Sequence, residues 1–406
     1  MESSEQSVLN IGTLGHIDHG KTSLTRAITK VWTDRHSESL KRNMTIKLGY
    51  ADAIIRKCQK CTGPESYTID TKCPNCGGKA EPLMKISILD APGHETLMAT
   101  ALAGSSVIDG ILFVIAANEP CPMRQTKEHL MIINLLDVKN VVIVQSKVDI
   151  VGREGAIKHY KQIKEFIKGS KIENAPIVPV MTNQGVNLDV LLEMIAKMEI
   201  PKRDLNADPF MYVVRSFDVN KPGIDATTIT GGVIGGAVLK GRFKAGDQIE
   251  IRPGVKLPSK GAKKDAYSPL ITKIDALNNG TIKLESAIPG GLIGISTEID
   301  PTFTKADGLV GNVVGHIGKL PESRSIVVFK YTKLERPDIP EQSVKENEAL
   351  ILGVGTATAI GYVKKVKKDT IEAELKRPVA AEKGTKIAVM RSIGQRWRLT
   401  GYGILG

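Results

Sequence analysis

The first half of the chain alternates short apolar runs with stretches of helical periodicity. One helical stretch, Thr22–Lys30, closely follows the first apolar run. The runs are rich in β-branched and aliphatic residues and are expected to be strands: Val8–Leu14, Ile86–Leu89, Ile111–Ala116, Val141–Gln145 and Ile177–Val180. Strands that alternate with helices build a parallel sheet covered on both faces. We therefore expect an α/β domain over residues 1–205.

The pattern changes at Ile200–Pro209, where two prolines and several charges interrupt the periodicity. Beyond this linker, short alternating runs are separated by glycines, as in residues 231–254, and nothing indicates a long amphipathic helix. Such a texture is typical of all-β barrels. A weaker Gly/Pro break near Pro321–Ser325 divides this half, so we expect one barrel over residues 206–325 and another over residues 326–406.

The chain carries a formal net charge of +12, from 56 Lys and Arg against 44 Asp and Glu. Residues 326–406 hold 15 basic and 9 acidic side chains, so half of the excess lies in the last fifth of the chain. A basic end domain suits a polyanionic partner such as nucleic acid, and an ordinary solvated lysine surface explains it equally well. The basic residues considered for a nucleic-acid surface are Lys364, Lys365, Lys367, Lys368, Arg391, Arg396 and Arg398.

The sequence carries no pattern of membrane insertion or export. No run approaches the roughly 18 uninterrupted apolar residues that a membrane span needs. The start, MESSEQSVLN, lacks the basic and then apolar order of a signal peptide. We expect a cytoplasmic protein without a membrane partner.

The segment Gly15–Thr22, GHIDHGKT, fits the P-loop pattern, after an expected strand and at the start of an expected helix. Its glycines let backbone N–H groups curl around phosphates, and the helix N-terminus adds a favourable dipole. Lys21 is expected to reach the β- and γ-phosphates, and the Thr22 hydroxyl to bind Mg²⁺. The expected nucleotide contacts are consecutive residues: Asp18, His19, Gly20, Lys21, Thr22 and Ser23.

A second motif, Asp90-Ala91-Pro92-Gly93, follows the apolar run Ile86–Leu89. The strand delivers the Asp90 carboxylate beside the P-loop, where it can hold a Mg²⁺-bound water. Such a pattern is by itself more often a turn, but a P-loop metal site requires a carboxylate of this kind. Asp18 is a further candidate for the Mg²⁺ site.

His94 follows this motif and is the candidate for orienting the attacking water. An imidazole can donate or accept a hydrogen bond near neutral pH, which suits that role. The alternative is a surface histidine that caps a helix. With Lys21 and Asp90, His94 completes the expected catalytic set.

GHIDHGKT followed by DAPGH resembles the translational GTPases, the family that includes elongation factor Tu. Further segments resemble the gamma subunit of archaeal and eukaryotic translation initiation factor two. These segments are Asn43–Tyr50, the paired cysteines after it, Ala116–Pro120, Arg215–Gly223, PGGLIGIST and the closing RWRLTGYG. The likeness therefore runs over essentially the whole chain.

The resemblance implies a GTPase domain followed by two β-barrels, with GTP or GDP and Mg²⁺ as ligands. It implies that the GTP state binds methionylated initiator tRNA for delivery to the small ribosomal subunit and releases it after hydrolysis. It also implies a heterotrimer with alpha and beta subunits. In the family pattern Thr45 reaches Mg²⁺ and the γ-phosphate from the first switch, and the Gly93 backbone meets the same phosphate.

The guanine motif of the family is Asn-Lys-x-Asp, whereas this chain has Ser146-Lys147-Val148-Asp149. Asp149 can accept two hydrogen bonds from the guanine edge, and Lys147 can lie over the ring. Ser146 offers one hydroxyl in place of an amide. Either the neighbouring loop is tethered by fewer bonds, or the serine tethers it well enough.

The second loop expected at the base departs from the family as well. After Pro179-Val180 the family has Ser-Ala, whereas Met181, Thr182 and Asn183 stand here. We still expect Thr182 and Asn183 to contact the nucleotide. GTP remains the expected ligand, because Asp149 discriminates the base and polar mismatches at a base edge are costly.

Four of the five cysteines form two pairs, Cys58-x-x-Cys61 and Cys73-Pro-Asn-Cys76. Each C-x-x-C turn presents two sulfurs on one side of a tight loop, so together they offer four thiolates to a tetrahedral Zn²⁺. Reduced, metal-free cysteines are the alternative, and a cytoplasmic setting disfavours disulfides. The pairs fall in an insertion at about residues 56–80, which has little core and needs a clip.

Three kinds of function are compatible with these motifs. The first is a tRNA-binding GTPase of initiation, with an elongation-type tRNA carrier as its close variant. The second is a metabolic nucleotide-coupled transferase, which shares the GTPase domain and the barrels. The third is a scaffold that binds nucleotide without turnover. The cysteine pairs and Asn43–Tyr50 favour the first.

Overall fold

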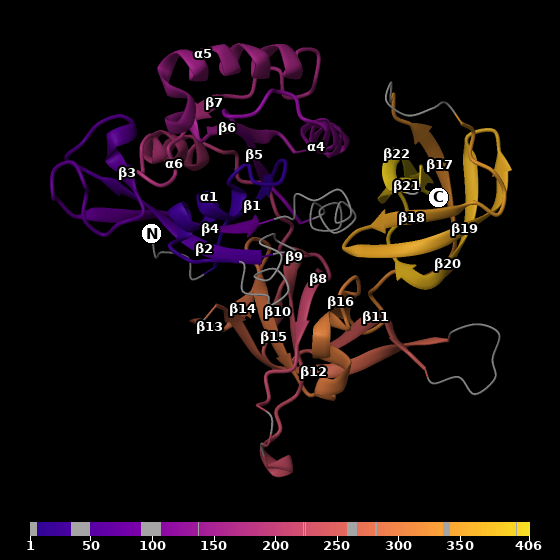
Figure 1. Cartoon of the computed structure of the whole chain (residues 1–406). Coiled ribbons are helices and arrows are strands. Elements are labelled where there is room, and N and C mark those ends of the chain that lie inside the picture. The colour runs from indigo at the N-terminus through magenta and orange to yellow at the C-terminus, as the bar shows by residue number, and fades with distance from the viewer. Residues whose placement is uncertain are drawn as a thin grey trace. The chain divides into compact units, whose positions relative to one another are not determined.

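The structure is a computed structural model. It describes residues 6–33, 49–90, 107–136, 138–221, 223, 225–257, 266–280, 282–335, 342–394 and 396–406. The chain divides into two compact units, Met1–Lys202 and Arg203–Gly406 (Figure 1). Among the helices that the structure describes, none is long and apolar enough to cross a membrane.

The first unit is built on a seven-stranded sheet with the order β3-β2-β4-β1-β5-β6-β7. Its strands are β1 (Leu9–Leu14), β2 (Gly49–Cys58), β3 (Tyr67–Thr68), β4 (Ala80–Asp90), β5 (Gly110–Ala116), β6 (Asn140–Ser146) and β7 (Ile177–Pro179). From β4 to β7 along the sheet the strands are parallel, and they contain the apolar runs expected from the sequence. β2 and β3 add an antiparallel edge. The predicted α/β class is confirmed.

Helices cover both faces of this sheet, so β1 and β5 are buried along their whole length. The helices are α1 (Lys21–Thr29), α4 (Arg124–Leu135), α5 (Val148–Ile167) and α6 (Leu188–Ala196), with a short turn η1 (Pro64–Ser66). Leu24 and Ile28 of α1 share one core cluster with Leu191 and Ile195 of α6. Right-handed crossovers place α4 and α5 on the opposite face, because the chain steps from β5 to β7 away from β4.

The second unit begins with a β-barrel, as its alternating texture predicted. Pairing between β11 and β12 closes the sheet order β11-β16-β8-β9-β15-β12 into a ring, and β13 extends it. The strands are β8 (Phe210–Phe217), β9 (Val233–Lys240), β11 (Gln248–Lys256), β12 (Tyr267–Asn279), β13 (Ile282–Leu284), β15 (Ile293–Thr297) and β16 (Val313–His316), with a small pair β10 (Phe243–Lys244) and β14 (Ser286–Ala287). Its described helical segments are short: η3 (Ala226–Thr228), α7 (Pro301–Thr304) and η4 (Lys305–Asp307).

A second closed barrel completes this unit, with the strand order β17-β20-β19-β18-β21-β22. The strands are β17 (Ser323–Lys333), β18 (Ala349–Val354), β19 (Ala357–Lys367), β20 (Thr370–Ala380), β21 (Lys386–Ile393) and β22 (Arg396–Leu405). β19 alternates strictly between buried and exposed residues from Ala357 to Lys364, as a strand with one face in a barrel core does. Phe210, Val313 and Leu320 pack against Ala380 where the two barrels meet.

Candidate nucleotide site and cysteine cluster

The P-loop leaves β1 at the point where the strand order reverses, between β4 and β5. Open α/β sheets bind ligands at such points, beyond the carboxyl ends of their strands. Gly15 has a φ of 148°, and a Cβ added there would collide with the Val114 carbonyl oxygen. Gly20 has a φ of 87° and is the N-cap of α1. Only glycine suits both positions, so the loop can close tightly onto the helix N-terminus.

Lys21, the first residue of α1, folds its ammonium across this loop. Its Nζ donates to the carbonyl oxygens of Gly15 at 3.0 Å and His16 at 2.7 Å. The side chain is buried, and burial lowers the pKa of Lys21 to about 8, against the attraction of Asp90 and Asp18. A cation is therefore held in place over the phosphate-binding loop.

Asp90, the last residue of β4, carries a fully buried carboxylate. Thr22 donates to its Oδ2 at 2.6 Å, and Thr13 donates to its Oδ1 at 2.9 Å. Thr33 donates a further hydrogen bond to Oδ2 at 3.0 Å. Burial raises the pKa of Asp90, while the Thr22 hydrogen bond and the charge of Lys21 oppose that rise. A buried carboxylate is costly without such partners, and the same chemistry suits a bound cation.

This donor set fits Mg²⁺ and a polyphosphate. Mg²⁺ takes oxygen ligands and keeps several waters, and the Thr22 hydroxyl and the Asp90 carboxylate supply oxygens beside each other. No side chain among the described residues caps the N-terminus of α1. Its first N–H groups can therefore bind an anion, with Lys21 as the neighbouring cation.

The side chain of His19 contacts groups outside the P-loop. Its Nδ1 lies 3.1 Å from the Val114 carbonyl oxygen, and its Nε2 lies 3.2 Å from Oε2 of Glu119. Burial lowers the pKa of His19 to about 4, although both partners favour the protonated ring. The expected nucleotide contact of His19 can therefore come only from its backbone. Asp18, in the same loop, is exposed with a φ of 58°.

The two candidate base loops leave neighbouring strands, β6 and β7. Ser146 ends β6, and its hydroxyl donates to the His19 carbonyl oxygen at 2.6 Å. Lys147 follows in the left-handed conformation with a φ of 56°, and Asp149 stands exposed in the first turn of α5. Thr182 and Asn183 lie in a turn closed by an antiparallel bridge between Met181 and Val186.

Three residues expected at this site lie outside the described residues: Thr45, Gly93 and His94. The remaining expected residues gather around the carboxyl ends of β1, β4, β6 and β7. Two partners of the site were not expected from the sequence, Thr13 and Thr33. Neither belongs to a motif, and only the spatial neighbourhood of Asp90 identifies them.

The four paired cysteines converge in the insertion between β2 and β4. Their sulfur atoms all lie within 4.8 Å of one another. Cys58 Sγ is 3.5 Å from Cys76 Sγ, and Cys61 Sγ is 3.7 Å from Cys73 Sγ. Four thiolates around a tetrahedral Zn²⁺ would lie about 3.8 Å apart, so the cluster fits that ion. Backbone N–H groups of Lys60 and Cys61 lower the pKa of Cys58 to about 7, whereas hydrogen bonds with Cys76 and Cys73 raise the pKa of Cys61 to about 12, so the cluster has to release protons when it binds a metal.

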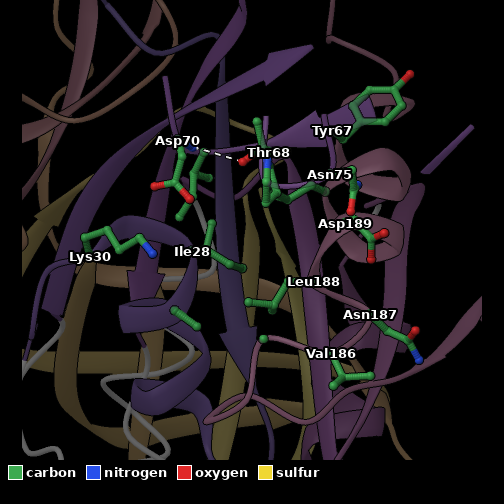
Figure 2. Close-up of a pocket in the computed structure, with 15 residues that line it drawn as sticks. Ile28, Lys30, Tyr67, Thr68, Asp70, Asn75, Val186, Asn187, Leu188 and Asp189 are labelled. Atoms are coloured by element: carbon green, nitrogen blue, oxygen red, sulfur yellow. Dashed lines mark hydrogen bonds between the residues drawn. The ribbon is translucent and has the colours of Figure 1, made fainter. Parts of the chain in front are cut away.

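A separate cavity of about 490 Å³ lies between the end of α1, the segment after β3 and the start of α6 (Figure 2). Ile28 and Leu188 line its apolar part, and Lys30, Asp70 and Asn75 contribute polar groups. None of the residues expected at the nucleotide lines it. Figure 2 also shows a hydrogen bond in the cavity wall. The Asp70 N–H donates it to the Thr68 hydroxyl, with 3.1 Å between nitrogen and oxygen.

The basic surface of the last barrel is smaller than its composition suggests. Lys365, Lys367 and Lys368 are exposed on and after the end of β19. Arg391 and Arg398, which the sequence placed with them, are buried at 7% and 6% exposure. Arg391 also donates to both carboxylate oxygens of Glu348, at 2.6 and 3.0 Å. The expectation that these two arginines face a polyanion is therefore wrong.

Two family models match the chain. One, described as the elongation factor Tu GTP binding domain, matches residues 6–201, and the other, described as initiation factor eIF2 gamma, C terminal, matches residues 327–405. The translation initiation factor 2 subunit gamma of Methanococcus maripaludis is 53% identical over the whole of both chains. That of Archaeoglobus fulgidus is 49% identical over 98% of this chain and 94% of its own. The chain belongs to the translation initiation factor 2 subunit gamma family.

Membership of this family makes the chain a translational GTPase, the GTPase subunit of a translation initiation factor. The predicted function and activity are confirmed at this level, and the metabolic transferase is set aside. GTP or GDP and Mg²⁺ follow as ligands of the GTPase domain.

Solved structures show the same fold in more distant proteins. A bacterial selenocysteine-specific elongation factor, EF-Sec, gives a TM-score of 0.73 at 23% identity over 98% of this chain and 58% of its own. The elongation factor SelB of Methanococcus maripaludis, in complex with the GTP analogue GPPNHP, gives 0.72 at 20% identity over 99% of this chain and 79% of its own. At these identities the likeness carries the fold alone.

Proposed function

We propose that the P-loop and the Asp90 carboxylate bind Mg²⁺ and GTP for hydrolysis. In this proposal Lys21 contacts the β- and γ-phosphates, Thr22 ligates Mg²⁺ and Asp90 holds a Mg²⁺-bound water. The observation that carries it is the buried Asp90 carboxylate, with the Thr22 hydroxyl at 2.6 Å and the charge of Lys21 beside it. The other loop contacts come from Asp18, His19, Gly20 and Ser23, with Asp18 also near the metal.

The chain's own groups then hold and polarise the phosphates. Bound Mg²⁺ neutralises charge that develops on the phosphate oxygens. Lys21 adds a fixed cation whose position is set before the substrate arrives, and this is the efficient form of electrostatic stabilisation. Thr45 and Gly93 are proposed to sense the γ-phosphate and His94 to orient the water, on the family pattern.

Guanine is proposed to bind between the two base loops. Asp149 accepts from the guanine edge, Lys147 covers the ring, and Thr182 and Asn183 border the base. The exposed Asp149 at the start of α5 is free to face a ligand, and Ser146 ties this loop to the P-loop.

The GTP state is proposed to bind methionylated initiator tRNA and carry it to the small ribosomal subunit, with release after hydrolysis. Membership of a family of gamma subunits supports a heterotrimer with alpha and beta subunits. The exposed lysines Lys365, Lys367 and Lys368 are the proposed basic contacts of the last barrel. Lys364, which pairs with Glu374 at 2.7 Å, adds less.

The test is tRNA binding measured with GTP and with GDP, for charged initiator and elongator tRNAs. Initiator tRNA should bind more tightly in the GTP state, and preference for elongator tRNA would favour the elongation-type carrier. Replacing Lys365, Lys367 and Lys368 with alanine should weaken binding and flatten its salt dependence by about one unit of log–log slope per lost phosphate contact. The matched control removes three exposed lysines of α5: Lys158, Lys161 and Lys164. An equal loss of tRNA affinity in both variants would mean that only the net charge of the protein matters, not the position of these lysines.

Three further assignments belong to this proposal. Cys58, Cys61, Cys73 and Cys76 bind a structural Zn²⁺, as their mutual distances support. The domains extend over residues 1–205, with the cysteine insertion at about 56–80, then 206–325 and 326–406. The protein acts in the cytoplasm, where translation initiation takes place.

A further inference from the structure

Thr33 lies beyond the recognised motifs but contacts the centre of the proposed metal site. Its hydroxyl donates to Oδ2 of Asp90 at 3.0 Å, the same oxygen that accepts from Thr22 at 2.6 Å. With Thr13 on Oδ1, three hydroxyl groups from three different segments surround the carboxylate. Two of these segments are fixed by the sheet and the P-loop, whereas Thr33 follows the end of α1.

Gly49 lies against Thr33. It is the first residue of β2 and pairs in register with Asp90 on β4. A Cβ added to Gly49 would lie 2.8 Å from Thr33 Cβ and 3.2 Å from the Thr33 carbonyl oxygen, distances that side chains do not tolerate without a shift. Thr33 is therefore packed between the Gly49 backbone and the Asp90 carboxylate.

The orientation of Asp90 matters because a carboxylate that holds a metal-bound water must present its lone pairs in fixed directions. Hydrogen-bonded partners of metal-binding groups provide that orientation, and removing one typically costs about 10- to 100-fold in metal affinity. Thr33 supplies one of the two hydroxyl bonds to Oδ2. The burial of Asp90 makes each remaining partner more important, since water cannot replace a lost donor easily.

We propose that Thr33 is a positioning residue for Mg²⁺, which fixes the Asp90 carboxylate and is itself set by close contact with Gly49. The inference rests on the proposed function, in which Asp90 and Thr22 hold the metal. It assigns Gly49 a role that requires the absence of a side chain and has no direct contact with the ligand.

The test measures release of fluorescently labelled GDP from the full chain over a range of free Mg²⁺ concentrations. In Thr33→Val the Mg²⁺ concentration that half-protects the complex should rise by about 10-fold or more. Release at saturating Mg²⁺ should return to the wild-type rate, which a general loss of structure would not allow. Thr33→Ser keeps a hydroxyl and should restore the wild-type Mg²⁺ dependence.

Gly49→Ala provides an independent variant, because it leaves the Thr33 hydroxyl intact and displaces it. It should shift the Mg²⁺ dependence in the same direction as Thr33→Val. Thr25→Val is the matched control, since Thr25 is a buried threonine of α1 whose hydroxyl donates to the Lys21 carbonyl oxygen. Gly294→Ala controls for a strand glycine, with its nearest side-chain and backbone neighbours at 3.8 and 3.9 Å.

The outcomes separate the two proposals. A wild-type protein that releases GDP at the same rate with and without Mg²⁺ would overturn both the metal site and this inference. A Mg²⁺-dependent wild type with an unchanged or lower half-protecting concentration in Thr33→Val would overturn the inference alone. The same applies if Thr33→Val shifts the curve but Thr33→Ser fails to restore it.

Discussion

The Ser146 hydroxyl donates a hydrogen bond to the backbone carbonyl of His19, with 2.6 Å between the two oxygens. The bond joins the end of β6 to the P-loop across most of the first unit's sequence. Ser146 is only 1% exposed, so water does not compete for this bond. Where the family motif has asparagine, this chain therefore still ties the base loop to the phosphate loop through one hydroxyl, and we predict that this tether is adequate.

Ser146→Ala should weaken GDP binding by about 5- to 10-fold, because a buried hydrogen bond contributes about 1 kcal/mol and the His19 carbonyl would be left unpaired. Ser146→Asn should not tighten binding, since the larger amide has to enter a buried position already filled by a short bond. Titration calorimetry with GDP measures both. Ser170→Ala is the control, because Ser170 also donates to a backbone carbonyl at 2.6 Å, but beyond the far end of α5. Tighter binding by the asparagine variant would contradict this account.

Asp149→Asn should lower the affinity for GDP by about 100-fold, because two hydrogen bonds to a charged acceptor contribute about 1.5 kcal/mol or more each. The same variant should gain affinity for xanthosine diphosphate. Xanthine has a carbonyl where guanine has an amino group, and the new amide can donate to it. Competition binding with GDP, ADP and xanthosine diphosphate measures the exchange of preference. Retained guanine preference in the variant would remove Asp149 from the base site.

Much of the first unit could be predicted from the sequence because parallel strands buried on both faces appear as continuous apolar runs. The P-loop helix was also predicted within one residue at each end, since α1 spans Lys21–Thr29. The antiparallel strand β2 was not predicted. Its residues alternate between buried and half-exposed positions, so Gly49–Cys58 lacks the continuous apolar run that marked its neighbours.

The candidate site, too, could be predicted only in part from the sequence. Lys21, Thr22 and Asp90 could be placed together because a short motif fixes each of them at the end of a known element. Thr33 could not, because its contact with Asp90 joins residues 57 positions apart and no local pattern encodes it. The burial of Arg391 was equally hidden, because it depends on Glu348, which lies 43 positions away in the sequence, just before the neighbouring strand β18.

Removing zinc should loosen the cysteine insertion without abolishing nucleotide binding. Native mass spectrometry should find one zinc ion per chain, and chelation should increase hydrogen exchange in residues 58–76. The reason is that η1, β3 and the two cysteine turns offer little core of their own, so the metal supplies much of their stability. GDP affinity should change little, since none of the cysteines belongs to the proposed nucleotide contacts. A protein purified without zinc and with equally protected cysteine turns would contradict the assignment.

His129 is a buried group that the proposed mechanism does not use. It lies on α4 with no exposed surface, and neither ring nitrogen has a hydrogen-bond partner among the described residues. Burial lowers the pKa of His129 to about 3, and the charge of Lys21 contributes in the same direction. The ring is therefore neutral in the folded protein at any pH near neutrality.

This makes the folded state sensitive to acid. In the unfolded chain His129 binds a proton near pH 6.5, whereas in the folded protein it stays neutral at that pH. Its folded pKa lies below its unfolded one, so stability is lost as pH falls from about 6.5 toward 3, by about 2 kcal/mol at pH 5. His129→Leu should stabilise the first unit, and its advantage in urea unfolding should grow by about that amount between pH 7.5 and pH 5.

Thr126→Val is the matched control. Thr126 is also buried on α4, and its hydroxyl has no partner in the part of the chain that the structure describes, but it does not titrate. The stabilisation by Thr126→Val should be equal at both pH values. A gain in His129→Leu that is equally independent of pH would mean that His129 still binds a proton in the folded protein.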